Sequence, residues 1–391
     1  WHMRIAATFP LALAFVSSST AFVTPLTRHW LRPRRKAQQI SAQSAEMSGA
    51  EMSDVKDLAV KAGRDISGAW VSAIAYMGDQ LGLFRKLAEA PNNGEGRGVT
   101  SAELSKSLQL NERYVREWLH AMVAAEYIEC ELVDSYVDRG EGTQEGKRKF
   151  FMTGAQRAVF AADESPFAMN GYFEFTLGSF RSIPEVMRCF RDGGGVPFSA
   201  LGPDVSHGIH RMHVPLFVHQ MPSWFANHPS LHDKMTRGIR FLDIGVGSGL
   251  STIELARRYP RTTFVGLDPD AVSIERARKA APPHLTNLDF VQSTIEGLPS
   301  HPQQVFFHGR HSFDAAFCFD VVHDLKDPVA ALSTIRSLLK PDGELLWSEP
   351  AGSVDPVENR STKRRTRQAL SILHCMTVSM AEGGEGLGTL I

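Results

Sequence analysis

A glycine-rich turn at residues 243–251, D-I-G-V-G-S-G-L-S, is the part of this sequence best suited to hold a ligand. Gly245, Gly247 and Gly249 let the backbone come close to a bound group that any side chain would block. A helix starting near Leu250 would point its amide end at the same group. Leu250 stands where the dinucleotide fingerprint G-x-G-x-x-G needs its third glycine. The turn therefore predicts a binding site and disfavours a nicotinamide oxidoreductase.

A second acid lies 19 residues past Gly249, at the end of the apolar run T-F-V-G-L-D. Asp268 at this position can accept hydrogen bonds from both hydroxyls of a ribose, as acids do in Rossmann sites generally. The alternative is a solvated carboxylate ahead of a helix. Asp243, directly before the turn, suits a cationic group better than a phosphate, because like charges repel. Together the two acids indicate a ligand that carries a ribose and a positive charge.

The elements that must position these residues begin at Arg240. Five apolar runs alternate with turns and helix-like or loop segments: R-F-L-D-I, T-F-V-G-L-D, L-D-F-V-Q, F-D-A-A-F-C-F-D and G-E-L-L-W-S-E. Such alternation predicts an α/β fold with a Rossmann-like, doubly wound parallel sheet. Ligands bind to these sheets outside the carboxyl ends of the strands. We expect His323 and Asp324 to open the helix after the fourth strand, at this same edge.

An acid before G-x-G-x-G, with a second acid at the end of the next strand, resembles the class I methyltransferases. The resemblance implies S-adenosylmethionine as cofactor, with Asp243 near its cationic methionine portion. An Asp is common in that family where this chain has Thr294, so adenine contacts there would use backbone or hydroxyl groups. Ile295 would pack on the adenine ring. The implied cofactor residues are Asp243, Gly245, Gly247, Gly249, Asp268, Pro269, Thr294, Ile295, Phe319 and Asp320.

The H-D-L-K-D-P segment that begins at His323 resembles small-molecule O-methyltransferases with an N-terminal winged helix. There, the histidine of a His-Asp pair deprotonates the acceptor hydroxyl, and an acid at the end of the fifth strand orients it. The resemblance assigns these catalytic roles to His323 and Glu349, and a neutral imidazole suits the first. A helix-capping or core histidine is the alternative, because Leu325 stands where that family usually has tryptophan. We expect no metal.

A closer resemblance spans residues 60–391. The stretches G-D-Q-L-G-L-F-R-K-L, N-E-R-Y-V-R-E-W-L, F-R-D-G-G-G-V-P-F and S-I-L-H-C-M-T-V-S-M-A-E-G-G-E-G-L-G-T are together similar to the winged-helix methyltransferases of the mycobacterial Rv-type hypothetical family. This similarity implies that the glycine loop at 193–195 lies over the cofactor. Tyr172 and Phe190 are candidates for the acceptor pocket, with core packing as the alternative.

The part before the sheet predicts a winged-helix or dimerisation domain at 56–163 and a helical connector at 164–236. Thr100, three residues before Glu103, predicts a capped helix, and two strands follow a second helix at 111–125. The second helix balances two arginines with two glutamates, whereas DNA readers present unopposed cations to phosphates. We therefore expect a homodimer contact and no nucleic-acid partner.

Residues 1–55 are expected to be a targeting presequence. An apolar run of about a dozen residues is too short to span a bilayer and ends in small residues, as in a signal peptide. The Arg- and Ser-rich segment after it has no acid before Glu46, as in a transit peptide. The S-T-A-F-V-T-P junction resembles bipartite plastid-targeting presequences. The prediction is a plastid protein; the secretory pathway and the cytoplasm are the alternatives.

Composition limits the remaining choices. A formal net charge of -1 gives no basic excess for a nucleic-acid backbone. Four scattered cysteines favour free thiols over a disulfide framework or a zinc site. The domain at 237–391 ends where a closing antiparallel pair of strands is expected, so we predict a truncated sheet. The sequence predicts an S-adenosylmethionine-dependent O-methyltransferase acting on an unidentified small molecule, with a winged-helix regulator or a catalytically silent cofactor-binding protein as alternatives.

Overall fold

A computed structural model describes residues 48–92, 97–132, 148–298, 311–350 and 352–388. The chain divides into two units, 1–65 and 66–391. The long helix α2 (Gly49–Gln80) crosses this division and supplies all the described secondary structure of the first unit. Within the described ranges, no helix combines the length and apolar character needed to traverse a bilayer. Most of the predicted presequence lies outside the described residues.

The predicted winged helix is present in the second unit. It consists of α3 (Leu83–Ala88), α4 (Ser101–Leu108), α5 (Glu112–Ala124), β1 (Glu129–Leu132), β2 (Arg148–Phe151) and α6 (Gly154–Phe160). The predicted capping box is formed, with the Thr100 side chain accepting from the backbone of Glu103. β1 and β2 pair antiparallel. Phe84 and Trp118 pack edge to face in the core, with ring centroids 4.9 Å apart.

The connector is helical, as predicted. Its elements are α7 (Asn170–Phe180), α8 (Ile183–Asp192), η2 (Phe198–Ala200), α9 (Pro203–Pro215), η3 (Leu216–Gln220), α10 (Met221–Ala226) and α11 (Pro229–Arg237). Arg211 of α9 is 7% exposed and binds Asp79 of α2 at 2.6 and 3.0 Å. The same guanidinium donates to Glu174 of α7 at 2.8 Å and to Asp163 at 2.5 Å. One buried cation therefore joins three segments through their carboxylates.

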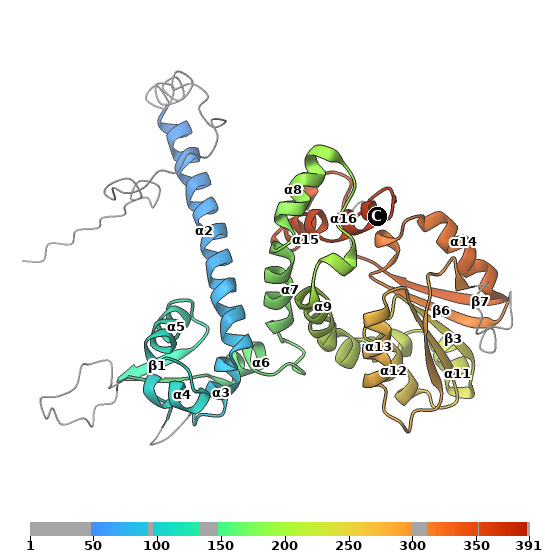
Figure 1. Cartoon of the computed structure of the whole chain (residues 1–391), viewed down its shortest axis with the longest axis horizontal. Coiled ribbons are helices and arrows are strands. Elements are labelled where there is room, and N and C mark those ends of the chain that lie inside the picture. The colour runs from blue at the N-terminus through green and yellow to red at the C-terminus, as the bar shows by residue number, and fades with distance from the viewer. Residues whose placement is uncertain (1–47, 93–96, 133–147, 299–310, 351, 389–391) are drawn as a thin grey trace, which may run out of the picture. The chain divides into compact units, whose positions relative to one another are not determined.

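The predicted parallel sheet is confirmed (Figure 1). Its strands are β3 (Arg240–Ile244), β4 (Thr263–Asp268), β5 (Leu288–Gln292), β6 (Phe313–Phe319) and β7 (Leu339–Ser348), in the order β5-β4-β3-β6-β7. α12 (Leu250–Arg258) and α13 (Ala271–Ala280) follow β3 and β4, and α14 (Pro328–Leu338) precedes β7. Phe241 packs in a cluster with α10–α12, while its neighbour Leu242 packs in the cluster that contains α14. This alternation places helices on both faces.

One prediction of secondary structure is wrong. His323 and Asp324 do not open the helix after β6, but lie in a short 3₁₀ turn, η6 (Val322–Asp324), before α14 begins at Pro328. Proline disfavours helical backbone in the residue before it and is well suited to the first turn of a helix. Asp327 then caps α14 by accepting from the amide of Ala330 at 2.9 Å. The histidine is therefore held in a tight turn at the carboxyl edge.

The chain continues from β7 into helices. η7 (Glu358–Arg360), α15 (Thr362–Leu373) and α16 (Cys375–Ala381) follow, and no sixth strand pairs with β7 in the described part of the chain. α16 packs against η6, and α15 packs against α8 of the connector. Figure 1 shows these last helices beside α8. The carboxyl edge of β6 is therefore covered by segments from both the connector and the end of the chain.

Candidate functional site

The glycine turn lies between β3 and α12 with a left-handed backbone at each predicted glycine. The φ angles of Gly245, Gly247 and Gly249 are 71°, 52° and 78°. A Cβ on Gly245 would lie 2.3 Å from the side chain of Val321, and one on Gly249 would lie 2.6 Å from Phe290. A Cβ on Gly247 would meet no atom within 4 Å. Two glycines are therefore required for packing, and the third leaves open space above the turn.

Asp243 is buried at the end of β3, with 2% of its surface exposed. Its Oδ2 accepts hydrogen bonds from the hydroxyls of Ser251 at 2.7 Å and Thr252 at 2.8 Å. Burial raises the pKa of the carboxyl to about 6, and the two hydroxyls only partly oppose this. In the protein itself, Asp243 anchors the first turn of α12 to β3. Its predicted attraction to a cationic ligand stays a prediction.

Asp268, the second predicted acid, is joined directly to the glycine turn. Its Oδ2 accepts from the amide of Gly247 at 2.8 Å, and its Oδ1 accepts from the amide of Asp270 at 2.9 Å. Burial raises the pKa of Asp268 to about 6. A carboxylate has about four acceptor positions, so each oxygen retains room for one more donor. The structure thus brings together the acid and the turn that the sequence paired.

His323 and Glu349, the predicted catalytic pair, are in contact. His323 is 2% exposed, and its Nδ1 lies against Oε2 of Glu349. The other oxygen of Glu349 accepts from the amide of Val322 at 2.8 Å and from the Trp347 indole at 2.9 Å. Because the carboxylate is held from several directions, it fixes the imidazole ring and leaves Nε2 on the edge that faces away from Glu349.

Three carboxylates surround this imidazole. Nε2 of His323 lies 3.2 Å from Oδ1 of Asp324 and 3.8 Å from Oδ1 of Asp320. Burial alone would lower the pKa of His323, but the hydrogen bond to Glu349 and the charges of the other two acids raise it to about 9. Burial has the opposite effect on a carboxyl group and raises the pKa of Asp324 to about 7.

Asp320 adopts a left-handed conformation, with φ at 59°, directly after β6. Such a conformation is unusual for a residue with a Cβ and often occurs at functional sites. It directs the two carboxylate oxygens of Asp320 toward two histidines. Oδ1 faces His323, and Oδ2 lies 3.8 Å from Nε2 of His213 on α9.

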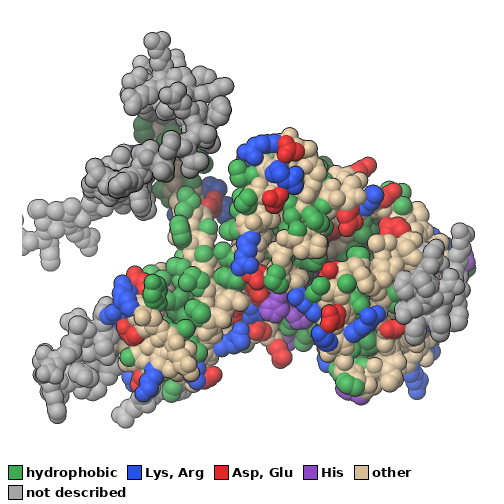
Figure 2. All heavy atoms as spheres, viewed as in Figure 1, with side chains coloured by type: hydrophobic (Ala, Val, Ile, Leu, Met, Phe, Trp, Pro, Cys, Tyr) green, Lys and Arg blue, Asp and Glu red, His purple; other side chains and the backbone are tan. Residues whose placement is uncertain are grey.

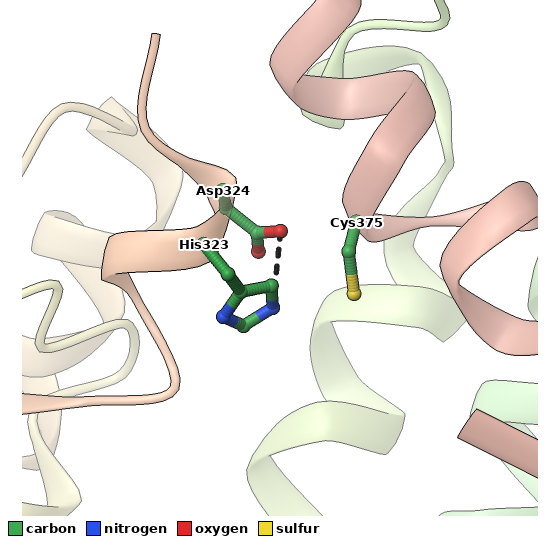
Figure 3. Close-up of side chains that lie close together, drawn as sticks. All are labelled: His323, Asp324 and Cys375. Carbon is green, nitrogen blue, oxygen red and sulfur yellow. Dashed lines mark ion pairs between the residues drawn. The ribbon is translucent and has the colours of Figure 1, made fainter. Parts of the chain in front are cut away.

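Cys375 approaches the same group from α16. Figure 3 shows its side chain beside those of His323 and Asp324, and the sulfur, an imidazole nitrogen and a carboxylate oxygen of Asp324 lie within 4.8 Å of one another. These three side chains could hold a metal, as could Asp320, His323 and Glu349. Burial and the nearby carboxylates raise the pKa of the Cys375 thiol, whereas metals bind the thiolate. In the protein itself, Cys375 is therefore a neutral thiol.

The remaining predicted cofactor residues differ in their surroundings. Thr294 is exposed, and its hydroxyl accepts from the amide of Gly297 at 3.1 Å. Ile295 is 3% exposed and packs in the core, which leaves little of it for the predicted adenine contact. Pro269 is exposed beside Asp268, and Phe319 stacks on Trp224 with centroids 5.5 Å apart.

The glycine loop at 193–195 and the two candidates for the acceptor pocket, Tyr172 and Phe190, also lie in different surroundings. A Cβ on Gly195 would lie 1.9 Å from the carbonyl oxygen of Thr377, so this part of the loop packs on α16. Gly193 and Gly194 have open space where a Cβ would be. Phe190 is 74% exposed, and Tyr172 is 42% exposed. Burial raises the pKa of Tyr172, and the charges of Arg367 and Asp320 act on it.

Histidines of α9 were missed by the sequence analysis. Nδ1 of His210 lies 2.6 Å from the hydroxyl of Ser248 in the glycine turn, and His213 faces Asp320. The signal was the H-G-I-H-R-M-H stretch, whose histidines recur every third residue and so share one side of a helix. Figure 2 shows histidine side chains gathered beside acidic and basic ones near α9. The connector therefore contributes polar groups to the sheet edge.

The second helix of the predicted winged domain, α5, has internally paired charges. Arg113 contacts Glu117, and Arg116 lies 3.5 Å from Glu112. Tyr114 on this helix is 79% exposed. These arginines are engaged by acids four residues away, in agreement with the expectation that the helix does not present unopposed cations to a phosphate backbone.

Two models of protein families match the chain. Residues 235–382 match a methyltransferase domain, and residues 69–136 match the Rv2258c-like winged HTH domain. Curated relatives include the ubiquinone biosynthesis O-methyltransferases of Actinobacillus pleuropneumoniae serotype 5b (strain L20) and Vibrio cholerae serotype O1 (strain M66-2). These are 32% and 31% identical over 111 residues, or 28% of this chain. The match covers 45% and 42% of those proteins, so the chain spans less than half of their length.

Solved structures share the fold over most of the chain. Human N-acetylserotonin methyltransferase in complex with SAM has a TM-score of 0.54 and 18% identity, covering 85% of this chain and 87% of that one. A putative O-methyltransferase from Nostoc punctiforme has a TM-score of 0.57 and 16% identity, covering 82% and 86%. At these identities the similarity establishes the fold, including the arrangement of helical region and parallel sheet.

Proposed function

We propose that this chain, which contains a methyltransferase domain behind an Rv2258c-like winged HTH domain, transfers a methyl group from S-adenosylmethionine to an oxygen of a small molecule. The observation that carries the proposal is the hydrogen bond between Asp268 and the amide of Gly247. It holds a half-buried carboxylate beside an open glycine turn, at the edge where parallel sheets bind ligands. Transfer to oxygen is supported by the similarity to ubiquinone biosynthesis O-methyltransferases and to a putative O-methyltransferase of known structure.

The residues present fit an adenosyl group. Asp268 keeps acceptor capacity for two ribose hydroxyls, and the open face of Gly247 admits a ligand against the backbone. The carboxylates near β6 suit a cationic sulfonium. When bound, S-adenosylmethionine supplies an activated methyl group and leaves as S-adenosylhomocysteine.

His323 is the group that we propose to accept the hydroxyl proton of the acceptor. Its Nδ1 is held by Glu349, so Nε2 must take the proton. The ring is fixed before the acceptor arrives, which removes part of the entropic cost of alignment. A His323→Gln variant keeps a polar side chain but cannot take a proton, and should lose most turnover. Full turnover in this variant would exclude the role as base.

Calorimetric titration tests the cofactor assignment. S-Adenosylhomocysteine should bind one site per chain, and Asp268→Ala should weaken binding by about 1–3 kcal/mol through the lost ribose contacts. Asp342→Ala, which removes an exposed carboxylate from the amino-terminal part of β7, is the matched control and should leave the affinity unchanged. Equal affinities of the Asp268 variant and the unaltered protein would contradict the proposed site.

A homodimer is proposed as the assembled state. Leu58, Ile66 and Trp70 of α2 are 68%, 60% and 70% exposed, which is unusual for large apolar side chains unless a partner covers them. Light scattering should give twice the chain mass, and Trp70→Glu should shift it toward the monomer. A monomeric unaltered protein would refute this proposal.

Delivery to a plastid is proposed from the presequence alone. The acid-poor segment after the apolar run is the support for it. A fluorescent protein fused behind residues 1–55 should enter plastids of an alga with secondary plastids. Fluorescence confined to the secretory pathway or the cytoplasm would favour one of the alternatives.

A further inference from the structure

Helix α8 has an apolar face that the described part of the chain leaves exposed. Ile183, Met187 and Phe190 follow one another at intervals of four and three residues, so they share one side of the helix. Their exposed fractions are 38%, 51% and 74%. Val186, on the adjacent side, is buried in a cluster with residues of α15 and α16. The exposed face therefore lies away from the contacts that hold α8 in the fold.

Basic side chains accompany this apolar face. α8 and α15, which are in contact, together carry six basic residues and two acidic ones. The basic residues are Arg188, Arg191, Lys363, Arg364, Arg365 and Arg367. Arg191 donates to the carbonyl oxygen of Met187 at 3.2 Å, so its charge lies beside the apolar face on a neutral group. Figure 2 shows hydrophobic and basic side chains next to each other over α8.

We propose that this docking surface, formed by Ile183, Met187 and Phe190 of α8 and the basic residues of α8 and α15, binds the anionic surface of a lipid bilayer. Amphipathic helices with aromatic and aliphatic residues on one face and Arg or Lys beside it lie in the bilayer interface. The apolar side chains enter the boundary between headgroups and acyl chains, and the basic groups bind lipid phosphates. This inference goes beyond the proposed methyl transfer and does not depend on it.

Other partners fit the docking surface less well. A nucleic acid would satisfy the basic side chains but leave the apolar face in water. A second copy of this chain that used the same surface would place like charges opposite each other, because α15 contains no acidic residue. Exposure rises along α8 toward Gly193 and Gly194, which have open space where a Cβ would be. A fluid bilayer accommodates such a projecting end without a matching shape, and it supplies apolar and anionic groups together.

The test is photo-crosslinking of the full chain to vesicles that contain a photoactivatable phosphatidylcholine, with mass spectrometry of the crosslinked peptides. In vesicles of phosphatidylcholine and phosphatidylglycerol, crosslinks should map to α8 and α15. Vesicles of phosphatidylcholine alone should lower their yield by about tenfold or more, because each basic residue near an anionic surface contributes about fivefold. Mapping by peptide separates this surface from residues 1–55, whose apolar run is also expected to meet a membrane.

Removal of the apolar face tests the role of α8. Met187→Ser combined with Phe190→Ser should lower the crosslink yield on α15, whose residues are unchanged, by about tenfold. Phe167→Ser is the matched control, because Phe167 is 68% exposed but precedes α7. It should leave the yield on α15 unchanged.

Reversal of one charge tests the role of α15. Lys363→Glu should lower the yield on α8 by about tenfold, since a lost attraction and a new repulsion act together. Lys279→Glu makes the same change at an exposed position of α13 and should keep the yield. High salt should weaken crosslinking of the unaltered chain at α8, because it screens exposed charges.

Several outcomes would overturn the proposal. Crosslinks confined to residues 1–55, or equal yields at α8 on neutral and anionic vesicles, would each do so. Binding of RNA without lipid crosslinks at α8 would assign the basic residues to a nucleic acid. Protection of the α8 amides from hydrogen exchange that grows with protein concentration, without vesicles, would assign the face to a second copy. Thermal melts check that the variants fold, and if the double serine variant does not, the crosslink positions in the unaltered chain still decide.

Discussion

Replacing Asp243 by asparagine should stabilise the free protein while weakening its affinity for S-adenosylmethionine. The carboxyl is 2% exposed, and burial raises its pKa to about 6 from an ordinary value of 3.8. At neutral pH the carboxylate is therefore ionised although its buried position favours the neutral form. Asparagine has no charge, and its amide oxygen can still accept from the hydroxyls of Ser251 and Thr252.

The magnitude follows from the displaced pKa. A raised pKa in the folded state gives a stabilising contribution that is fully present below pH 3.8 and is lost as the pH rises through 6. A shift of about two units corresponds to about 3 kcal/mol at pH 8 and roughly half of that at pH 5. The Asp243→Asn variant should gain this amount relative to the unaltered protein, because its side chain does not titrate.

Urea denaturation at pH 5 and pH 8 measures the effect. The difference in the free energy of unfolding between Asp243→Asn and the unaltered chain should grow by about 1–2 kcal/mol between these pH values. Asp342→Asn removes an exposed carboxylate and should show no such growth. A difference that stays constant with pH would refute the argument that a buried charge limits stability here. Titration with S-adenosylmethionine should give weaker binding if Asp243 attracts the cationic ligand.

Other perturbations test the remaining features. Arg211→Met leaves buried carboxylates without their cation and should lower the free energy of unfolding by about 3–5 kcal/mol, as measured in urea; a loss below about 1 kcal/mol would contradict the network. Gly249→Ala should lower the melting temperature through backbone strain and collision, whereas Gly247→Ala, which faces open space, should mainly weaken S-adenosylhomocysteine binding in calorimetry. If His323 is the base, kcat/KM should rise with pH up to about 9, because the ring must lose its proton. Glu349→Gln removes a group that raises this pKa, so the rise of kcat/KM with pH should move to lower pH. If the rise does not move, His323 is not the base.

The sheet and its glycine turn could be predicted because their signals are local. Each strand is a short apolar run, and neighbouring residues such as Phe241 and Leu242 are both apolar because they face helices on opposite sides. Asp268 could be paired with the turn because parallel strands bring their carboxyl ends to one edge. Composition and spacing were therefore enough to predict the fold and the edge of the sheet at which a ligand binds.

The charge around His323 could not be predicted in the same way. It depends on the left-handed backbone of Asp320 and on the tight turn before Pro328. Cys375 and His213 come from segments far away in the chain, and no periodic pattern links them to β6. Contacts of this kind are set by how helices pack across the sheet edge, and a sequence read one window at a time does not contain them.

The seating of the glycine loop on α16 has a consequence for biosynthesis. The amide of Val196 donates to the carbonyl of Thr377 at 3.0 Å and to its hydroxyl at 2.9 Å, across 181 positions of the chain. At about 5–20 residues per second, the ribosome needs roughly 10–40 s to make the distance between the two segments. During this interval the aromatic-rich connector has been synthesised but α16 has not. We therefore expect the nascent chain to bind chaperones that shield apolar surface.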